Sequence, residues 1–182
     1  MKIPFITALF ALIVLASVAT APAMPAAELR KKSEAALEQL FETKPGTKEL
    51  ADMAEAVLVF PEVVKAGFMI GGQRGDGVLF RNGEAEGYFN TTSASYGWQV
   101  GAQVFSYVLF FMDQKSLDSL YKADGFEVGA APSLVIANEG FTSDLSTKTM
   151  KNGIYAFFFG QKGIMAGISL QGTKITEFKP SK

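Results

Sequence analysis

The pattern of apolar and polar positions changes near residue 61. Before this point apolar residues recur every three or four positions, which is the spacing of a helix that buries one face. After it they come in short runs separated by glycine, which is typical of strands. Residues 28–60 therefore predict two helices, and residues 62–178 predict mostly strands.

The first predicted helix covers Glu28 to Glu42 and ends before Pro45-Gly46. One face gathers its apolar residues, while basic and acidic residues cover the rest; the apolar set includes Leu29, Leu37, Leu40 and Phe41. The second predicted helix begins at Thr47 as N-cap and continues through Val57 and Leu58 to Phe60. It stops there because the residue before a proline is driven out of the helical region.

Glycine separates the predicted strands. Residues 63–70 and 78–81 predict strands, and the glycines at 71, 72, 75 and 77 between them predict turns. Asn82-Gly83 predicts a two-residue hairpin followed by a return strand to Asn90. Further strands are expected over residues 96–112, with bends or bulges at Gly97 and Gly101, and over 125–128, 132–138, 154–159, 163–170 and 172–178. Residues 115–121 predict a short helix with Ser116 as a possible cap, and residues 160–163 a hairpin turn. The expected fold is α+β: a curved antiparallel sheet or partial barrel with two N-terminal helices and one short internal helix.

The N-terminus carries the pattern of a secretory signal peptide. A positive Met1-Lys2 precedes an apolar stretch that runs to Ala21, and small residues follow it. We expect residues 1–23 to be the signal and residues 24–182 to form a single domain; cleavage after Ala26 and an uncleaved membrane anchor are the alternatives. The expected location is exported, periplasmic or outer-membrane-associated, and the absence of cysteine excludes a lipoprotein anchor.

Composition excludes several kinds of site. The 182 residues contain no Cys and no His, which excludes a cysteine nucleophile, a Ser-His-Asp triad and zinc held by thiolate or imidazole. The net charge of −1 gives no basic footprint for nucleic acid. Acidic residues are scattered and nothing in the sequence pairs them, so we expect no catalytic residue, metal or cofactor, and an enzyme working with carboxylates is the third hypothesis.

Two local features could bind an anion. Arg30, Lys31 and Lys32 lie on the polar face of the first helix, where they could attract anionic lipid headgroups while Leu29, Leu37, Leu40 and Phe41 insert. The alternative is a helix packed on the sheet with a solvated polar face. Turn amides near Gly72, Arg74 and Gly75 could form a small anion nest, although sheet turns explain these glycines more simply.

Four segments give the chain a family resemblance. They are residues 60–68 (FPEVVKAGF), 71–79 (GGQRGDGVL), 97–103 (GWQVGAQ) and 162–172 (KGIMAGISLQG). In this order and at these intervals they resemble the SYLF domain, also called the Ysc84 or DUF500 domain, over nearly all of residues 30–178.

The resemblance implies a lipid-binding module without catalytic residues. Eukaryotic members bind phosphoinositides, in part through an N-terminal amphipathic helix that the segment Glu28 to Glu42 matches, and some fungal members bind actin. The signal pattern makes actin an implausible partner for this chain, so we carry over an anionic lipid or membrane surface without naming a headgroup. The second hypothesis is an envelope structural domain that binds a protein partner and no lipid.

Overall fold

The structure is a computed structural model that describes residues 24–122, 125–128, 134–137, 152–163 and 172–181. Its helices are α2 (Ala26–Thr43), α3 (Thr47–Met53) and α4 (Gln114–Leu120). Its strands are β1 (Ala56–Arg81), β2 (Glu84–Phe111), β3 (Phe126–Glu127), β4 (Leu134–Ala137), β5 (Ile154–Gly163) and β6 (Thr173–Glu177). The α+β prediction is confirmed, including two helices before the sheet and a short one within it.

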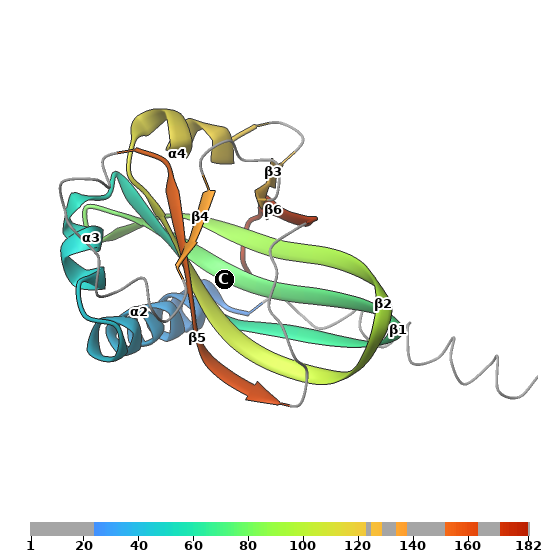
Figure 1. Ribbon diagram of the computed structural model, residues 1–182. Helices are drawn as coiled ribbons and strands as arrows, with labels where there is room; N and C mark the ends of the chain where they lie inside the picture. Colours follow the sequence, from blue (N-terminus) through green and yellow to red (C-terminus); the bar gives the residue numbers. More distant parts are fainter. Residues whose placement is uncertain (1–23, 123–124, 129–133, 138–151, 164–171, 182) are drawn as a thin grey trace, which may run out of the picture.

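One long antiparallel hairpin of β1 and β2 forms the centre of the fold (Figure 1). Pairing runs from Ala56 opposite Phe111 to Arg81 opposite Glu84. Asn82 and Gly83 make the turn at φ values of 51° and 79°, as the Asn-Gly pair predicts. The return strand and the strand expected over 96–112 form one continuous strand, β2. The break predicted between them is therefore wrong.

The glycines at 71, 72, 75 and 77 lie within β1 and not in turns, which corrects the sequence prediction. They allow the bent strand to pass close to its own earlier part. A Cβ added at Gly77 would lie 2.5 Å from the carbonyl oxygen of Val59, and one at Gly75 would lie 2.7 Å from that of Glu62. A side chain at either position would therefore collide with backbone.

The other strands extend the hairpin into a curved open sheet in the order β3-β6-β2-β5-β4, with β1 also paired to β2. β6 pairs with the first part of β2, and β5 with the last part. The pairing of β4 with β5 is parallel, a departure from the expected antiparallel sheet. β5 also continues through residues 160–163, so the turn predicted there is wrong, and the return strand predicted from Gly163 falls almost entirely outside the described residues.

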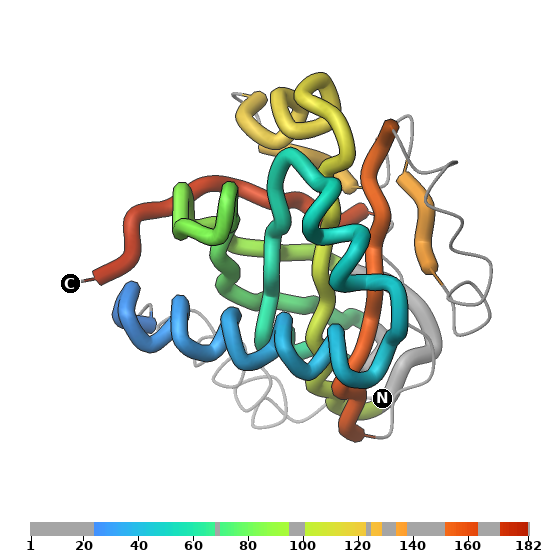
Figure 2. Tube along the Cα trace, turned by 90° about the vertical axis from the view of Figure 1, so that its left-hand side faces the viewer, coloured from blue at the N-terminus to red at the C-terminus, as the bar shows by residue number. Residues whose placement is uncertain are grey.

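The two faces of the curved sheet bury separate apolar clusters. Leu58 and Phe60 point to the concave side, where Tyr107 stacks on Phe60 with ring centroids 4.6 Å apart. Val57 and Val59 point to the convex side, where they join a cluster that includes residues of α2 and α3. Figure 2 shows α2 lying across the outside of the strands. Because both faces are covered, β1 shows apolar runs and not simple alternation.

Helix boundaries differ from the predictions at three points. α3 ends at Met53 and not at Phe60, because Val57 and Leu58 pair with β2 as strand. Gly46, at φ 86°, is the N-cap of α3, and Thr47 is its first residue. α4 is capped by Asp113, whose carboxylate accepts a 2.8 Å hydrogen bond from the backbone N–H of Ser116. A cap side chain acts from just before the helix, which is where Asp113 lies.

Candidate functional site

The apolar face of α2 is packed on the sheet. Leu29 and Leu40, predicted to insert into lipid, are 1% and 0% exposed and lie in the convex-side cluster. Leu37 and Phe41 are half-buried at the edge of that contact. Insertion of Leu29 or Leu40 would therefore require α2 to leave the sheet, whereas Leu37 and Phe41 keep part of their surface in solvent.

The three basic residues predicted to bind headgroups lie together near the start of α2, and ion pairs occupy two of them. Arg30 contacts Glu34 at 2.8 Å and Glu84 of the hairpin at 3.7 Å, and Lys32 contacts Glu28 at 3.3 Å. The bond with Glu34 raises the pKa of Arg30 above its usual range, which keeps the guanidinium charged. Exposed ion pairs contribute about 0–1 kcal/mol, so a phosphate could compete for these cations.

Lys31 is exposed and has no ion pair among the described residues. It is thus the cation of the triplet whose charge is least compensated.

The charges along α2 run against the helix dipole. Basic residues and Glu34 lie in its first half, Glu38 and Glu42 follow in the second half, and the last turn has no basic residue. The positive N-terminal end of a helix favours acids and its C-terminal end favours bases, each worth about 0.3–1 kcal/mol. Apart from Glu28, this order gains little from the helix dipole, and the electrostatic stabilisation of the helix comes from the i,i+4 pairs Glu28–Lys32 and Arg30–Glu34.

The C-terminal segment lies against the start of α2, a contact that the sequence did not indicate. The backbone N–H of Ala26 donates to the carbonyl oxygen of Ser181 at 3.2 Å. Lys179, two residues before Ser181 in this segment, is exposed. No local pattern could have revealed this contact, because the two segments are about 150 positions apart in the chain.

The other half of α2 borders a cleft whose lining is part apolar and part acidic. The cleft lies between α2, α3 and the turn of the hairpin, and has a volume of about 480 Å³. Leu37, Phe41, Val57 and Phe80 contribute apolar surface to it. Its acidic lining residues are Glu34, Glu38 and Asp52. Sequence reasoning missed this site because its walls come from three separate elements.

The segment predicted as an anion nest is paired strand. Gly72, Arg74 and Gly75 lie opposite Ala94, Thr92 and Thr91 in the ladder between β1 and β2. None of the three has a positive φ. A nest needs successive amides that converge in a turn, whereas amides in a strand point alternately to either side. This backbone does not provide the turn on which the prediction depended.

Comparison with known families gives one match, and a search of the curated proteins found none. Residues 92–180 match the model of the Ysc84 family, described as Las17-binding protein actin regulator. Over these residues the chain is similar to the Ysc84 family. The resemblance seen in the sequence motifs is therefore confirmed.

The Ysc84 stretch begins within β2 and includes α4 and every described element after it. Two of the four motif segments lie inside it, and the two on β1 precede it. The basic triplet on α2 also precedes it, so the match itself identifies no binding residue.

Ysc84 domains serve in lipid and actin-related binding and are generally non-catalytic. Two of the acids in this chain have structural partners: Asp76 accepts from the amide of Asn90 at 2.6 Å, and Asp113 caps α4. Among the described residues no group of three or more Asp and Glu could hold a metal ion. None of the described helices is long and apolar enough to cross a membrane.

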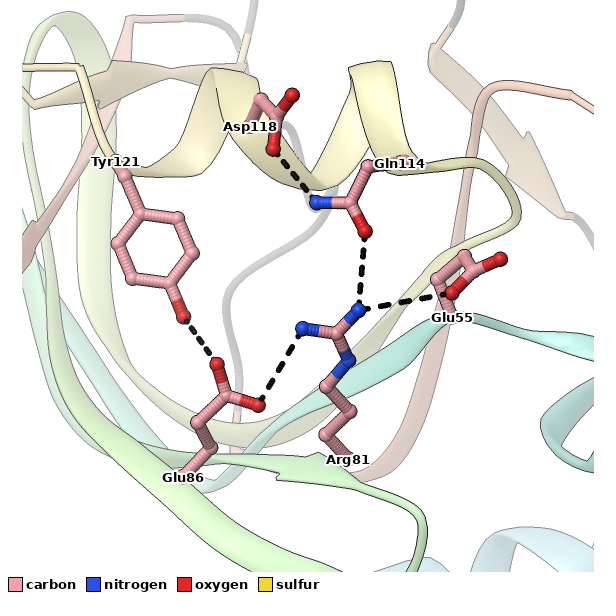
Figure 3. A network of polar contacts seen from close by, with 6 residues as sticks. All are labelled: Glu55, Arg81, Glu86, Gln114, Asp118 and Tyr121. Atoms are coloured by element: carbon pink, nitrogen blue, oxygen red, sulfur yellow. Dashed lines mark hydrogen bonds and ion pairs between the residues drawn. The ribbon is translucent and has the colours of Figure 1, made fainter.

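A polar network joins α4 of the Ysc84 stretch to the hairpin (Figure 3). Arg81 lies between Glu55, Glu86 and Gln114, at 3.8, 4.0 and 3.0 Å. Tyr121 donates to Glu86 at 3.2 Å, and partial burial together with that carboxylate raises the pKa of Tyr121 to about 12. Gln114 also donates to Asp118 at 2.6 Å, so the network contains one cation among three acids and links α4 to the hairpin.

Proposed function

We propose that this chain is a non-catalytic lipid-binding module of the bacterial cell envelope. Arg30, Lys31 and Lys32 would bind anionic phospholipid headgroups, with α2 held on the glycine-bent sheet. The observation that carries the proposal is the gathering of three cations at the start of α2, in a chain whose residues 92–180 match a family with lipid-binding roles. The signal-peptide pattern of residues 1–23 supports export to the periplasm or outer membrane.

Binding would begin with the helix docked. Each Lys or Arg near an anionic membrane contributes about 1 kcal/mol, so the triplet supplies about 3 kcal/mol without any change of fold. Insertion is a second step. Exposing Leu29 and Leu40 to water costs about 1.5–3 kcal/mol each. Transfer of these side chains into the hydrocarbon of the membrane recovers a similar free energy. Leu37 and Phe41 need less movement, so they would insert first.

Vesicle sedimentation of the chain from Met24 onward tests the proposal. We expect binding to vesicles with anionic lipid and little binding to neutral vesicles. Replacing Arg30, Lys31 and Lys32 together by Glu should lower partitioning by roughly a hundredfold or more, because about 3 kcal/mol of attraction becomes repulsion. Raising the salt concentration should release a docked chain but not one whose helix has inserted.

The matched control replaces three exposed lysines on other elements, Lys48, Lys115 and Lys122, by Glu. It makes the same change in net charge, so it should retain most of the binding. Equal binding to neutral and anionic vesicles, or equal losses in the two triple variants, would contradict the proposal.

A further inference from the structure

The partly acidic cleft at the second half of α2 has a different chemistry from the basic triplet at the first half. Residues of its apolar lining come from the helix (Leu37, Phe41) and from the hairpin (Val57, Phe80). Its volume of about 480 Å³ falls within the range of about 300–1,000 Å³ found for ligand pockets. It is large enough for one or two apolar side chains of a partner.

The charged residues of the cleft indicate the charge of the partner that it would bind. Lys and Arg are absent from its lining. Glu34 is paired with Arg30, but Glu38 and Asp52 have no ion pair among the described residues. These two exposed carboxylates come from α2 and α3, so they border the apolar surface from two elements. The C-terminal half of α2 adds the negative end of the helix dipole.

Such a surface repels phosphate and attracts cations that flank an apolar group. An anionic lipid is therefore the wrong occupant. We propose that the cleft binds a basic segment of a partner protein, in which one or two large apolar side chains enter the cleft and neighbouring Lys or Arg residues pair with Glu38 and Asp52. Headgroup binding at the basic triplet does not involve the cleft, because the triplet lies at the other end of α2 and has the opposite charge. Insertion of Leu37 and Phe41 into lipid would compete with the partner, since both residues line the cleft.

Fluorescence anisotropy with short labelled peptides tests the proposal. The probe is Lys-Lys-Leu-Phe-Lys-Lys, and the comparison peptides replace either its lysines by Glu or its Leu-Phe by Ser-Ser. We expect saturable binding of the probe to the chain from Met24 onward, and at least tenfold weaker binding of both comparison peptides. Absence of saturable probe binding would overturn the proposal.

Paired charge reversals locate the site. The double variant Glu38→Lys with Asp52→Lys should weaken probe binding at least tenfold. The control, Glu42→Lys with Glu49→Lys, changes exposed acids of the same two helices outside the cleft lining and should alter binding less than twofold. All four side chains are exposed, so neither variant should disturb folding, which thermal unfolding checks. Equal losses of probe binding in both variants would mean non-specific attraction. No loss in the first variant would mean that the probe binds elsewhere on the protein. Either result overturns the proposal.

Sedimentation of the same two variants on anionic vesicles separates this proposal from the lipid proposal. If the cleft binds protein and the triplet binds lipid, reversal at Glu38 and Asp52 abolishes peptide binding and leaves vesicle binding intact or stronger. A parallel loss of vesicle binding would contradict the assignment of the two ligands to two ends of α2.

Discussion

The bent hairpin and helix α2 serve the molecule in different ways. In the hairpin, backbone passes so close to backbone that Gly75 and Gly77 have no room for a side chain. On α2, one face is buried against the sheet, while the other face carries charged residues that are exposed or half-buried. The hairpin therefore tolerates little change for reasons of packing, whereas the exposed face of α2 can vary in charge without loss of fold. Binding residues are therefore best sought on the exposed face of α2, where substitutions do not disturb packing.

Substitution of Gly77 in the hairpin should lower the stability of the protein more than the other changes described below. The Cβ of Gly77→Ala would lie 2.5 Å from the carbonyl oxygen of Val59 and 2.6 Å from the ring of Phe60. We expect the free energy of unfolding to fall by at least about 3 kcal/mol, the upper range for overpacked cores. Urea denaturation measures this. Gly72→Ala is the control, because its Cβ would meet a carbonyl oxygen at 3.4 Å; similar losses in both would refute the close-approach explanation.

The second largest effect on stability is expected from truncation of a buried leucine on α2. Leu40→Ala should lower the free energy of unfolding by about 3 kcal/mol, since Leu40 is fully buried in the convex-side cluster. Leu37→Ala should cost about 1 kcal/mol or less, because its side chain is half-buried beside the cleft. Denaturant titration of the two variants distinguishes a docked helix from a loose one. A cost at Leu40 no larger than that at Leu37 would show that α2 is not docked in solution.

The smallest effect is expected at Asp113, which lies outside both regions. Burial alone would raise its pKa, but hydrogen bonds from the backbone N–H groups of Gly153 and Ser116 and from the Ser116 hydroxyl lower it overall. Asp113→Ala should cost about 1 kcal/mol at neutral pH, the usual value of an N-cap.

The pH dependence of this cost follows from the lowered pKa. The stabilisation is present above the ordinary Asp pKa of about 4 and is lost as the pH falls through the lower folded value. The difference between the chain and its Asp113→Ala variant, measured by denaturation at several pH values, should therefore narrow below about pH 4. A difference that stays constant down to pH 2 would contradict a role for the ionised carboxylate.

Local patterns were sufficient for much of the fold. The helical spacing before residue 45 gave α2, and Asn82-Gly83 gave the central turn, because both depend on residues that are neighbours in sequence. Patterns failed for Val57 and Leu58, which extend the apolar spacing of α3 but pair with β2. They failed again at Gly71 to Gly77, where glycine signalled a turn and the real cause was a strand passing close by.

The sequence by itself determined the order of elements, the composition that lacks cysteine and histidine, the basic triplet on the first helix and the family motifs. Tertiary structure alone decided that Leu29 and Leu40 face the sheet, that the C-terminal segment lies against the start of α2, and that Glu38 and Asp52 border one cleft. The reason is physical: spacing along a chain shows which residues share a face, but the partner of that face is set by long-range pairing and burial.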